Sequence, residues 1–297
     1  MARTDEGLRS EMLRGALDDA LTTSSRDRLE ALLARHGGLP SARANHKLAA
    51  AFANEVASRG ARVLPLVLSL ARHPARDDEP TAFLPIAAAF ALVALANRAD
   101  REPAGLDEAL AALTGHDSAA VRIGASAALA GHAPDALVAR AGRWLDADDH
   151  EARFATTAAT LDALADPNVL AGLRDATALL AYLDRVLDAL ASASRAAERS
   201  PARRRALAAL GPALARVVQS VRGGGEWLHE HAARAEHPDL RDALGRALDR
   251  LRKSSVGKAE IASIHAALDA SAPPLRDPTR DNREARGRGR RAKRRGG

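Results

Sequence analysis

A short pattern that recurs along the chain constrains the fold more than any other feature of the sequence. An apolar residue and an arginine are followed, after five residues, by an alanine and a leucine. Copies begin at Val121, Ala202 and Leu240, and a degenerate copy begins at Ala152. A repeated helical hairpin cannot bury its apolar face alone, so neighbouring hairpins must stack on it. The sequence therefore predicts an array of helical hairpins.

Composition favours helix throughout this array. Alanine accounts for 72 of the 297 residues, and aromatic residues make up only 2%. Alanine has the highest helix propensity, whereas the β-branched and aromatic residues typical of strands are scarce. We therefore predict an all-α protein whose residues 1–270 form one array, with 1–100 as a divergent or capping part.

Capping and breaking residues divide the array into helices. Pro40-Ser41 opens a helix that ends at Gly60, and the segment Ser192–Ser200 is a connection or a frayed helix end. A first helix is expected to start near Thr4, and a second to run from Ser24 or Ser25 to Gly37-Gly38. Further helices are expected at 61–72, 81–98, 105–114, 118–131, 134–145, 149–164, 168–174, 176–193, 201–221, 226–235, 238–252 and 257–269.

The positive charge is concentrated at the C-terminus. The chain has a net charge of +6, but residues 276–297 hold ten bases and three acids, which leaves −1 for residues 1–275. From residue 271 onward almost no apolar residue occurs, so burial cannot offset the entropy of ordering this segment. We expect residues 271–297 to be a disordered tail.

Several classes of site and location are excluded by simple observations. Cysteine is absent, which excludes disulfides, thiolate catalysis and cysteine-ligated metals. The longest apolar run, 82–96, is interrupted by Pro85 and is too short to span a bilayer comfortably. Early acids at Asp5 and Glu6 are unlike a secretion signal. We expect a cytoplasmic protein that does not contact a membrane.

Two stretches resemble a known repeat family. The segment from Asp117 to Leu129 and the segment from His237 to Leu248 are similar to the first helix of HEAT repeats, including the bacterial phycobilisome-lyase-like subgroup. The likeness covers 117–165 and 200–252. It implies a right-handed α-solenoid in which each recurring arginine (Arg122, Arg153, Arg203 and Arg241) pairs with an acid of the neighbouring repeat. HEAT-like folds occur in scaffolds, transport adaptors, lyases and repair enzymes, so the resemblance does not define an activity.

One tryptophan lies beside charged residues. Arg143, Trp144 and Asp146 resemble distantly the chemistry of HEAT-like DNA alkylation-repair glycosylases, which use tryptophans and a carboxylate. However, Leu137, Ala141 and Trp144 form one helical stripe, which indicates a core position for the tryptophan. Nearby carboxylates would also repel phosphate. Arg143 remains a candidate interaction residue.

A second tryptophan follows three glycines. Trp227 is the candidate for an exposed aromatic contact, because Leu228 and Ala232 already occupy the core stripe of its helix. Glu226 and His229 have the Glu-x-x-His spacing of di-iron bundles, but such sites need two copies and further carboxylates. Gly223 and the two glycines after it indicate a hinge between helices. We predict no metal and no cofactor.

The tail has the composition of a polyanion-binding segment. Flexible arginines neutralise phosphates without sequence preference, and no aromatic residue is present to stack on bases. A solubilising appendage is the alternative. Residues expected to contact nucleic acid are Arg286, Arg288, Arg290, Arg291, Lys293, Arg294 and Arg295.

These observations predict a non-enzymatic HEAT-repeat scaffold that binds another protein and contacts nucleic acid weakly through its tail. The alternative is a DNA-lesion-processing or chromophore-lyase-like enzyme on the same scaffold. A deep pocket holding a buried carboxylate beside an aromatic ring would favour the enzyme.

Overall fold

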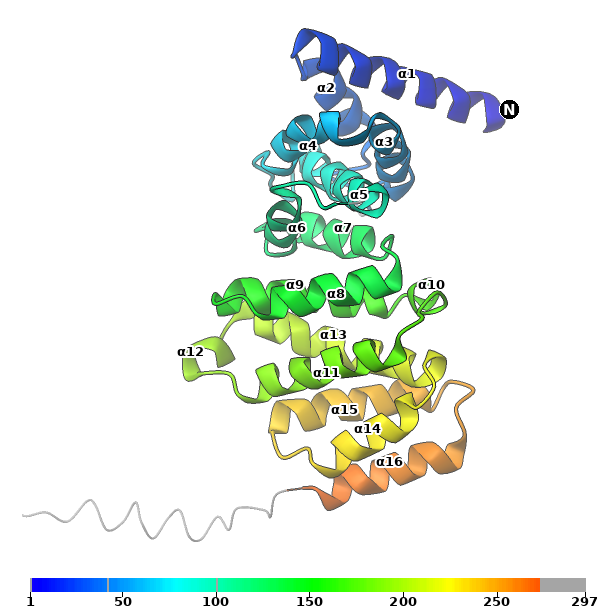
Figure 1. Cartoon of the computed structure of the whole chain (residues 1–297), viewed down its shortest axis with the longest axis vertical. Helices are drawn as coiled ribbons and strands as arrows, with labels where there is room; N and C mark the ends of the chain where they lie inside the picture. The colour runs from blue at the N-terminus through cyan, green and yellow to red at the C-terminus, as the bar shows by residue number, and fades with distance from the viewer. Residues whose placement is uncertain (1, 42, 100, 273–297) are drawn as a thin grey trace, which may run out of the picture.

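The computed structural model describes residues 2–41, 43–99 and 101–272, and this part is helical with no β-strand, as predicted (Figure 1). The α-helices are α1 (Ala2–Thr23), α2 (Asp27–His36), α3 (His46–Arg59), α4 (Leu64–Ala71), α5 (Phe83–Arg98), α6 (Leu106–Thr114), α7 (Ala119–Leu129), α8 (Pro134–Leu145), α9 (His150–Leu164), α10 (Pro167–Leu170), α11 (Ala176–Ala191), α12 (Arg195–Glu198), α13 (Pro201–Ser220), α14 (Gly224–Ala233), α15 (Pro238–Leu251) and α16 (Lys258–Ala270). Two 3-10 helices, η1 (Gly60–Val63) and η2 (Pro80–Ala82), precede α4 and α5.

The helices stack in layers along the long axis of the molecule, from α1 at one end to α16 at the other (Figure 1). Helices α3, α5, α7, α9, α13 and α15 each pack against the next, and we refer to them as the first row. Helices α4, α6, α8, α11, α14 and α16 form the second row, within which α4 packs on α6, α8 on α11 and α14 on α16. The core lies between the two rows.

Helix starts in the repeated region follow the sequence signals. Ser118 accepts a hydrogen bond from the N–H of Val121 at 3.2 Å, and Ser200 does the same for Arg203 at 3.2 Å. Such side-chain caps satisfy N–H groups that lack a partner within the helix. The predicted bounds of α8 agree with the structure at both ends.

Helix α5 is the most apolar element and is buried inside the stack. The apolar helical stretch runs over Pro80–Arg98 and is long enough to cross a membrane, so the expectation from 82–96 that it is too short is wrong. Its 18-residue window with a mean hydropathy of 1.7 is nevertheless 67% buried within the protein. Helices α3, α4 and α7 cover it. A helix that is apolar all round needs such cover, so α5 acts as a core helix. Gly124 of α7 lets the neighbouring helix approach closely, because a Cβ there would lie 2.7 Å from Ile86.

Four predicted helix bounds are wrong. The helix expected at 168–174 is α10, which already ends at Leu170. The helix expected from Pro40 begins only at His46, because the Asn45 side chain caps it by accepting from Leu48 N–H at 3.1 Å. The connection expected at 192–200 contains the short helix α12, which Ser194 caps. Helix α14 begins at Gly224, since only Gly223 takes the positive φ of the turn.

The packed part of the chain extends just beyond residue 270. The Ser271 hydroxyl donates to the carbonyl oxygen of Ala232 at 2.8 Å and accepts from Arg241 at 2.6 Å. Ser271 therefore belongs to the helical array and not to the tail. The rest of the predicted tail, 273–297, lies outside the described residues, and so do its expected nucleic-acid contacts.

Candidate functional site

The recurring arginines bind mainly to the turn that precedes their own helix. Arg153 donates to the carbonyl oxygen of Ala147 at 2.6 and 2.9 Å, and Arg241 donates to that of Ala235 at 3.0 Å. Arg122 makes the equivalent bond, again to the residue six positions earlier. The predicted pairing with an acid of the next repeat is therefore wrong for these three, because a nearer carbonyl is within reach.

Arg203 alone makes the predicted contact with the next repeat. Its Nη1 lies 2.7 Å from a carboxylate oxygen of Asp239, at the start of α15. Its Nη2 donates to the carbonyl oxygen of Leu190 at 2.9 Å, at the end of α11. Arg203 is only 1% exposed, so this buried guanidinium ties three helices together.

Carboxylates of one layer cap helices of the next layer. Asp77 accepts from the N–H of Ala120 at 3.1 Å, and Asp135 accepts from that of Asp175 at 3.2 Å. Glu151 accepts from the N–H of Ala202 at 3.2 Å. We refer to Asp77, Asp135 and Glu151 as the interlayer carboxylates. Hydrogen bonding by Ser118 and Ala120 lowers the pKa of Asp77, so the bond favours its charged form.

The charged residues near Trp144 form a closed network. Arg140 is buried and pairs with Asp107 and, at 2.6 Å, with Glu102. Arg143 is half-exposed and pairs with Glu102 at 3.0 Å and with Asp107 at 3.7 Å. Burial raises the pKa of Asp107, partly opposed by the Arg140 charge. Trp144 is buried as predicted, with the Arg140 guanidinium 5.7 Å from its ring centre. The structure thus brings a perturbed carboxylate beside an aromatic ring, but two arginines already neutralise it.

Trp227 is half-buried, which differs from the exposed position that we predicted. Its indole N–H donates to Asp184 of α11 at 2.7 Å, and its ring lies 4.3 Å from that of His231. His231 also contacts Asp184, at 3.1 Å. These contacts hold α14 against α11. Within the described residues, no group of three or more histidine, aspartate or glutamate side chains is placed to hold a metal ion.

Three neighbouring cavities of about 360, 400 and 710 Å³ lie along four successive first-row helices, α7, α9, α13 and α15. The first two share the lining residue Ala208 and the last two share Arg246, and we refer to the three cavities together as the first-row groove. Its charged lining residues are Arg122, Asp162, Arg204, Arg205, Arg216, Asp239, Asp242, Arg246, Asp249, Arg250 and Lys253.

The first cavity has an apolar floor. Ile123 of α7 is 65% exposed, and with Met12 it is one of two large apolar side chains exposed in the described chain. Alanine side chains end at Cβ and leave space between the helices. The alanines that line this cavity are Ala119, Ala155, Ala158, Ala159, Ala208 and Ala209.

Opposite charges flank this floor. Desolvation lowers the pKa of Arg205, and the nearby positive charge of Arg122 lowers it further. Desolvation by the surrounding helices raises the pKa of Asp162. The side chain is nevertheless exposed to solvent, because it lines the cavity. Arg205 forms no ion pair with any residue that the structure describes. The charge of Glu151 partly opposes the lowering of the Arg205 pKa but forms no ion pair with Arg205, so a cation without a directly paired carboxylate among the described residues lines the cavity.

The third cavity is basic. Arg216 is bound to Gln219 at 3.1 Å, and Arg246 is paired with Asp242. Arg250 of α15 and Lys253 in the turn after it make no ion pair in the described part of the chain. Positions 246 and 250 share one face of α15, and Lys253 lies just beyond the end of this helix.

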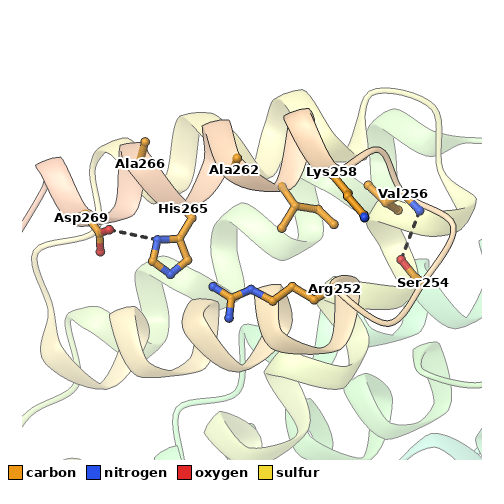
Figure 2. A pocket seen from close by; sticks show the side chains of 9 residues that line it. Arg252, Ser254, Val256, Lys258, Ala262, His265, Ala266 and Asp269 are labelled. Atoms are coloured by element: carbon orange, nitrogen blue, oxygen red, sulfur yellow. Dashed lines mark hydrogen bonds and ion pairs between the residues drawn. The ribbon is translucent and has the colours of Figure 1, made fainter.

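A separate cavity of about 600 Å³ lies at the end of the array, between α15 and α16 (Figure 2). His265 and Asp269 meet there, with Nδ1 and Oδ2 3.0 Å apart. The Ser254 hydroxyl donates to the Leu251 carbonyl oxygen at 2.7 Å and accepts from Val256 N–H at 3.3 Å, so it is bound to the backbone of its own turn, while His265 is bound to Asp269. This cavity marks the outer face of the last layer, against which no further described hairpin packs.

Of the charged residues that line the groove, sequence reasoning singled out only Arg122, as a recurring arginine. The available signals were the run Arg203-Arg204-Arg205, the charge stripe on α15 and the apolar Ile123 beside the recurring Arg122. Neither tryptophan lines the groove, and the candidate Arg143 lies in the network near Trp144 instead.

Comparison of the chain with protein-family models, with curated proteins and with solved structures finds no match.

Proposed function

We propose that the chain is a right-handed, HEAT-like α-solenoid that acts as a non-enzymatic scaffold in the cytoplasm and binds another protein in its first-row groove. The observation that carries the proposal is the row of three neighbouring cavities lined by four successive helices. Neighbouring cavities on stacked helices suit an extended ligand better than a small substrate.

The exposed Ile123 supports a protein partner. Apolar side chains in a concave surface with a polar rim are typical of interaction sites. The basic tail would add a weak contact with a polyanion, for which residues 286–295 supply the charge.

The second candidate is an enzyme on the same scaffold, and Asp107 beside Trp144 is the observation that favours it. Catalysis by Asp107 would need a carboxylate free to accept or donate a proton. Its ion pairs with Arg140 and Arg143 compete with that role. We therefore place the scaffold first.

Affinity capture tests the scaffold proposal. The full chain is cross-linked to its partners, and each recovered protein is then used in a reciprocal capture. The proteins recovered with wild type are compared with those recovered with Ile123→Asp. The control is Ala139→Asp, an exposed position on α8 in the second row. We expect a partner that is retained by the control and lost from Ile123→Asp. Recovery of the same proteins with wild type, Ile123→Asp and Ala139→Asp would contradict the proposal.

A further inference from the structure

We infer that the first-row groove binds an extended acidic segment of a partner protein, with at least one apolar side chain seated against Ile123. This inference rests on the scaffold proposed above and adds the chemistry of the partner. Three features of the groove carry it: its charge, its apolar floor and its length.

The groove concentrates positive charge on an otherwise slightly acidic body. Seven bases and four acids line it, whereas residues 1–275 as a whole carry −1. Arg204, Arg205, Arg250 and Lys253 form no ion pair with described residues. These cations lie on α13, on α15 and in the turn after α15, so carboxylates of a ligand would find partners there. Complementary charge of this kind directs association and sets specificity.

The apolar requirement comes from the other end of the groove. Ile123 and the alanines named above line the cavity between α7, α9 and α13. Burying a leucine-sized side chain there would stabilise the complex by removing apolar surface from water. A purely acidic ligand would leave this cavity empty. A ligand that combines both features would fill the groove.

The length of the groove sets the length of the ligand. Four adjacent helices are separated by three interaxial distances of about 8–10 Å each. An extended chain advances about 3.3 Å per residue, so about seven to nine residues would cross the groove. An extended peptide thus matches its dimensions.

Two other occupants fit less well. Single-stranded nucleic acid relies on aromatic side chains for stacking, and the lining holds none, while a phosphate backbone offers no apolar group to fill the cavity at Ile123. The tail of this chain carries +7 over residues 276–297, so it would be repelled by the basic lining. An acidic protein segment is therefore the occupant that the groove favours.

Fluorescence anisotropy with the full chain tests the inference. The probe is a labelled peptide of three Glu-Leu-Glu units, and its controls replace leucine by serine or glutamate by lysine. A labelled oligothymidylate of similar length gives the nucleic-acid arm. Because the tail can also attract an acidic peptide, the chains compared all retain it. The groove variants are Arg204→Glu/Arg205→Glu and Ile123→Ser.

The matched control is Arg195→Glu/Arg199→Glu, which reverses two exposed charges on α12 without touching the groove. Circular dichroism and melting verify that each variant is folded. We expect Arg204→Glu/Arg205→Glu to weaken peptide binding by about tenfold or more, and the control to change it by less than about twofold. Replacing leucine by serine in the peptide should weaken binding to wild type but not to Ile123→Ser.

Three outcomes would overturn the inference. Equal loss in the groove variant and the α12 control would mean that the tail or the overall charge holds the peptide. Loss of oligothymidylate binding in the groove variant, with peptide binding unchanged, would assign the groove to nucleic acid. No binding of the peptide to wild type, with partner capture still dependent on Ile123, would refute the acidic ligand and leave the scaffold proposal standing.

Discussion

The buried Arg203 offers a quantitative test of how the layers are held together. Its guanidinium lies between Asp239 of α15 and the carbonyl oxygen of Leu190 in α11. The Arg203 side chain is almost completely buried, whereas that of Asp239 is 47% exposed. Removing either partner should therefore have different consequences, and the difference can be worked out.

Arg203→Met preserves most of the side-chain volume and removes the charge. It leaves the Leu190 carbonyl without this donor, which costs about 1–3 kcal/mol. It also removes the desolvation penalty of a buried guanidinium, which offsets part of that loss. We expect a net destabilisation of about 1–2 kcal/mol.

Asp239→Asn instead leaves the guanidinium buried without its counter-ion. Breaking a fully buried ion pair costs about 3–5 kcal/mol, but solvent at the half-exposed carboxylate reduces this to about 2 kcal/mol. The double variant removes both charges, so its loss should be smaller than the sum of the single losses by about 1 kcal/mol.

Urea unfolding followed by circular dichroism at neutral pH measures these values. Arg204→Met serves as control, because it changes an adjacent exposed arginine and should alter the unfolding free energy by less than about 0.5 kcal/mol. Additive losses in the double variant, or an Arg203→Met chain as stable as the control, would show that this buried contact does not couple the layers.

Four further expectations can be checked separately. Burial lowers the pKa of His132 to about 4 from an ordinary value of 6.5, so between these pH values only the unfolded chain binds this proton. The free energy of unfolding should therefore decrease as the pH falls below 6.5, by about 2 kcal/mol at pH 5. Urea unfolding at pH 7.5 and 5 should show a smaller decrease for His132→Gln than for wild type. Val121→Asp would place an unpaired charge in the core and should destabilise the protein by several kcal/mol. An unchanged melting curve would disprove the helix register that we assign to α7. Gly124→Leu should force α7 away from Ile86 and cost about 1–3 kcal/mol or more in the same assay, whereas Gly245→Ala, where a Cβ meets nothing within 4 Å, should not destabilise. Removing residues 273–297 should abolish DNA binding measured by anisotropy without changing the melting temperature. In the full chain, with about six phosphates neutralised, the affinity for DNA should fall about a thousandfold between about 50 and 200 mM salt. A truncated chain that still binds DNA tightly would contradict this expectation.

Local signals were sufficient to predict most helices. The Pro134 start and the polar turn after Leu145 define α8, and the serine caps define α7 and α13. The helix expected from Pro40 was misplaced because the cap at Asn45 depends on the path of the loop before it. A side chain that can cap a helix does so only where the backbone turns appropriately.

The groove could not be predicted in the same way. Ile123, Ala158 and Ala208 belong to three helices that are brought together only by stacking. Likewise, the acids that pair with Arg140 are more than 30 residues away in sequence. A periodic pattern identifies which face of a helix is apolar, but not which neighbouring face it meets.

The interlayer carboxylates give the array a direction. Asp77, Asp135 and Glu151 each serve an N–H group that lies 39–51 residues later in the chain. During synthesis from the N-terminus, each acceptor is therefore already present when the helix that needs it emerges. Loss of the last layers would leave the caps of earlier layers in place, whereas loss of the first layers would uncap helices that remain. Shortening this chain from its two ends should thus be tolerated unequally, with the C-terminal end the more permissive.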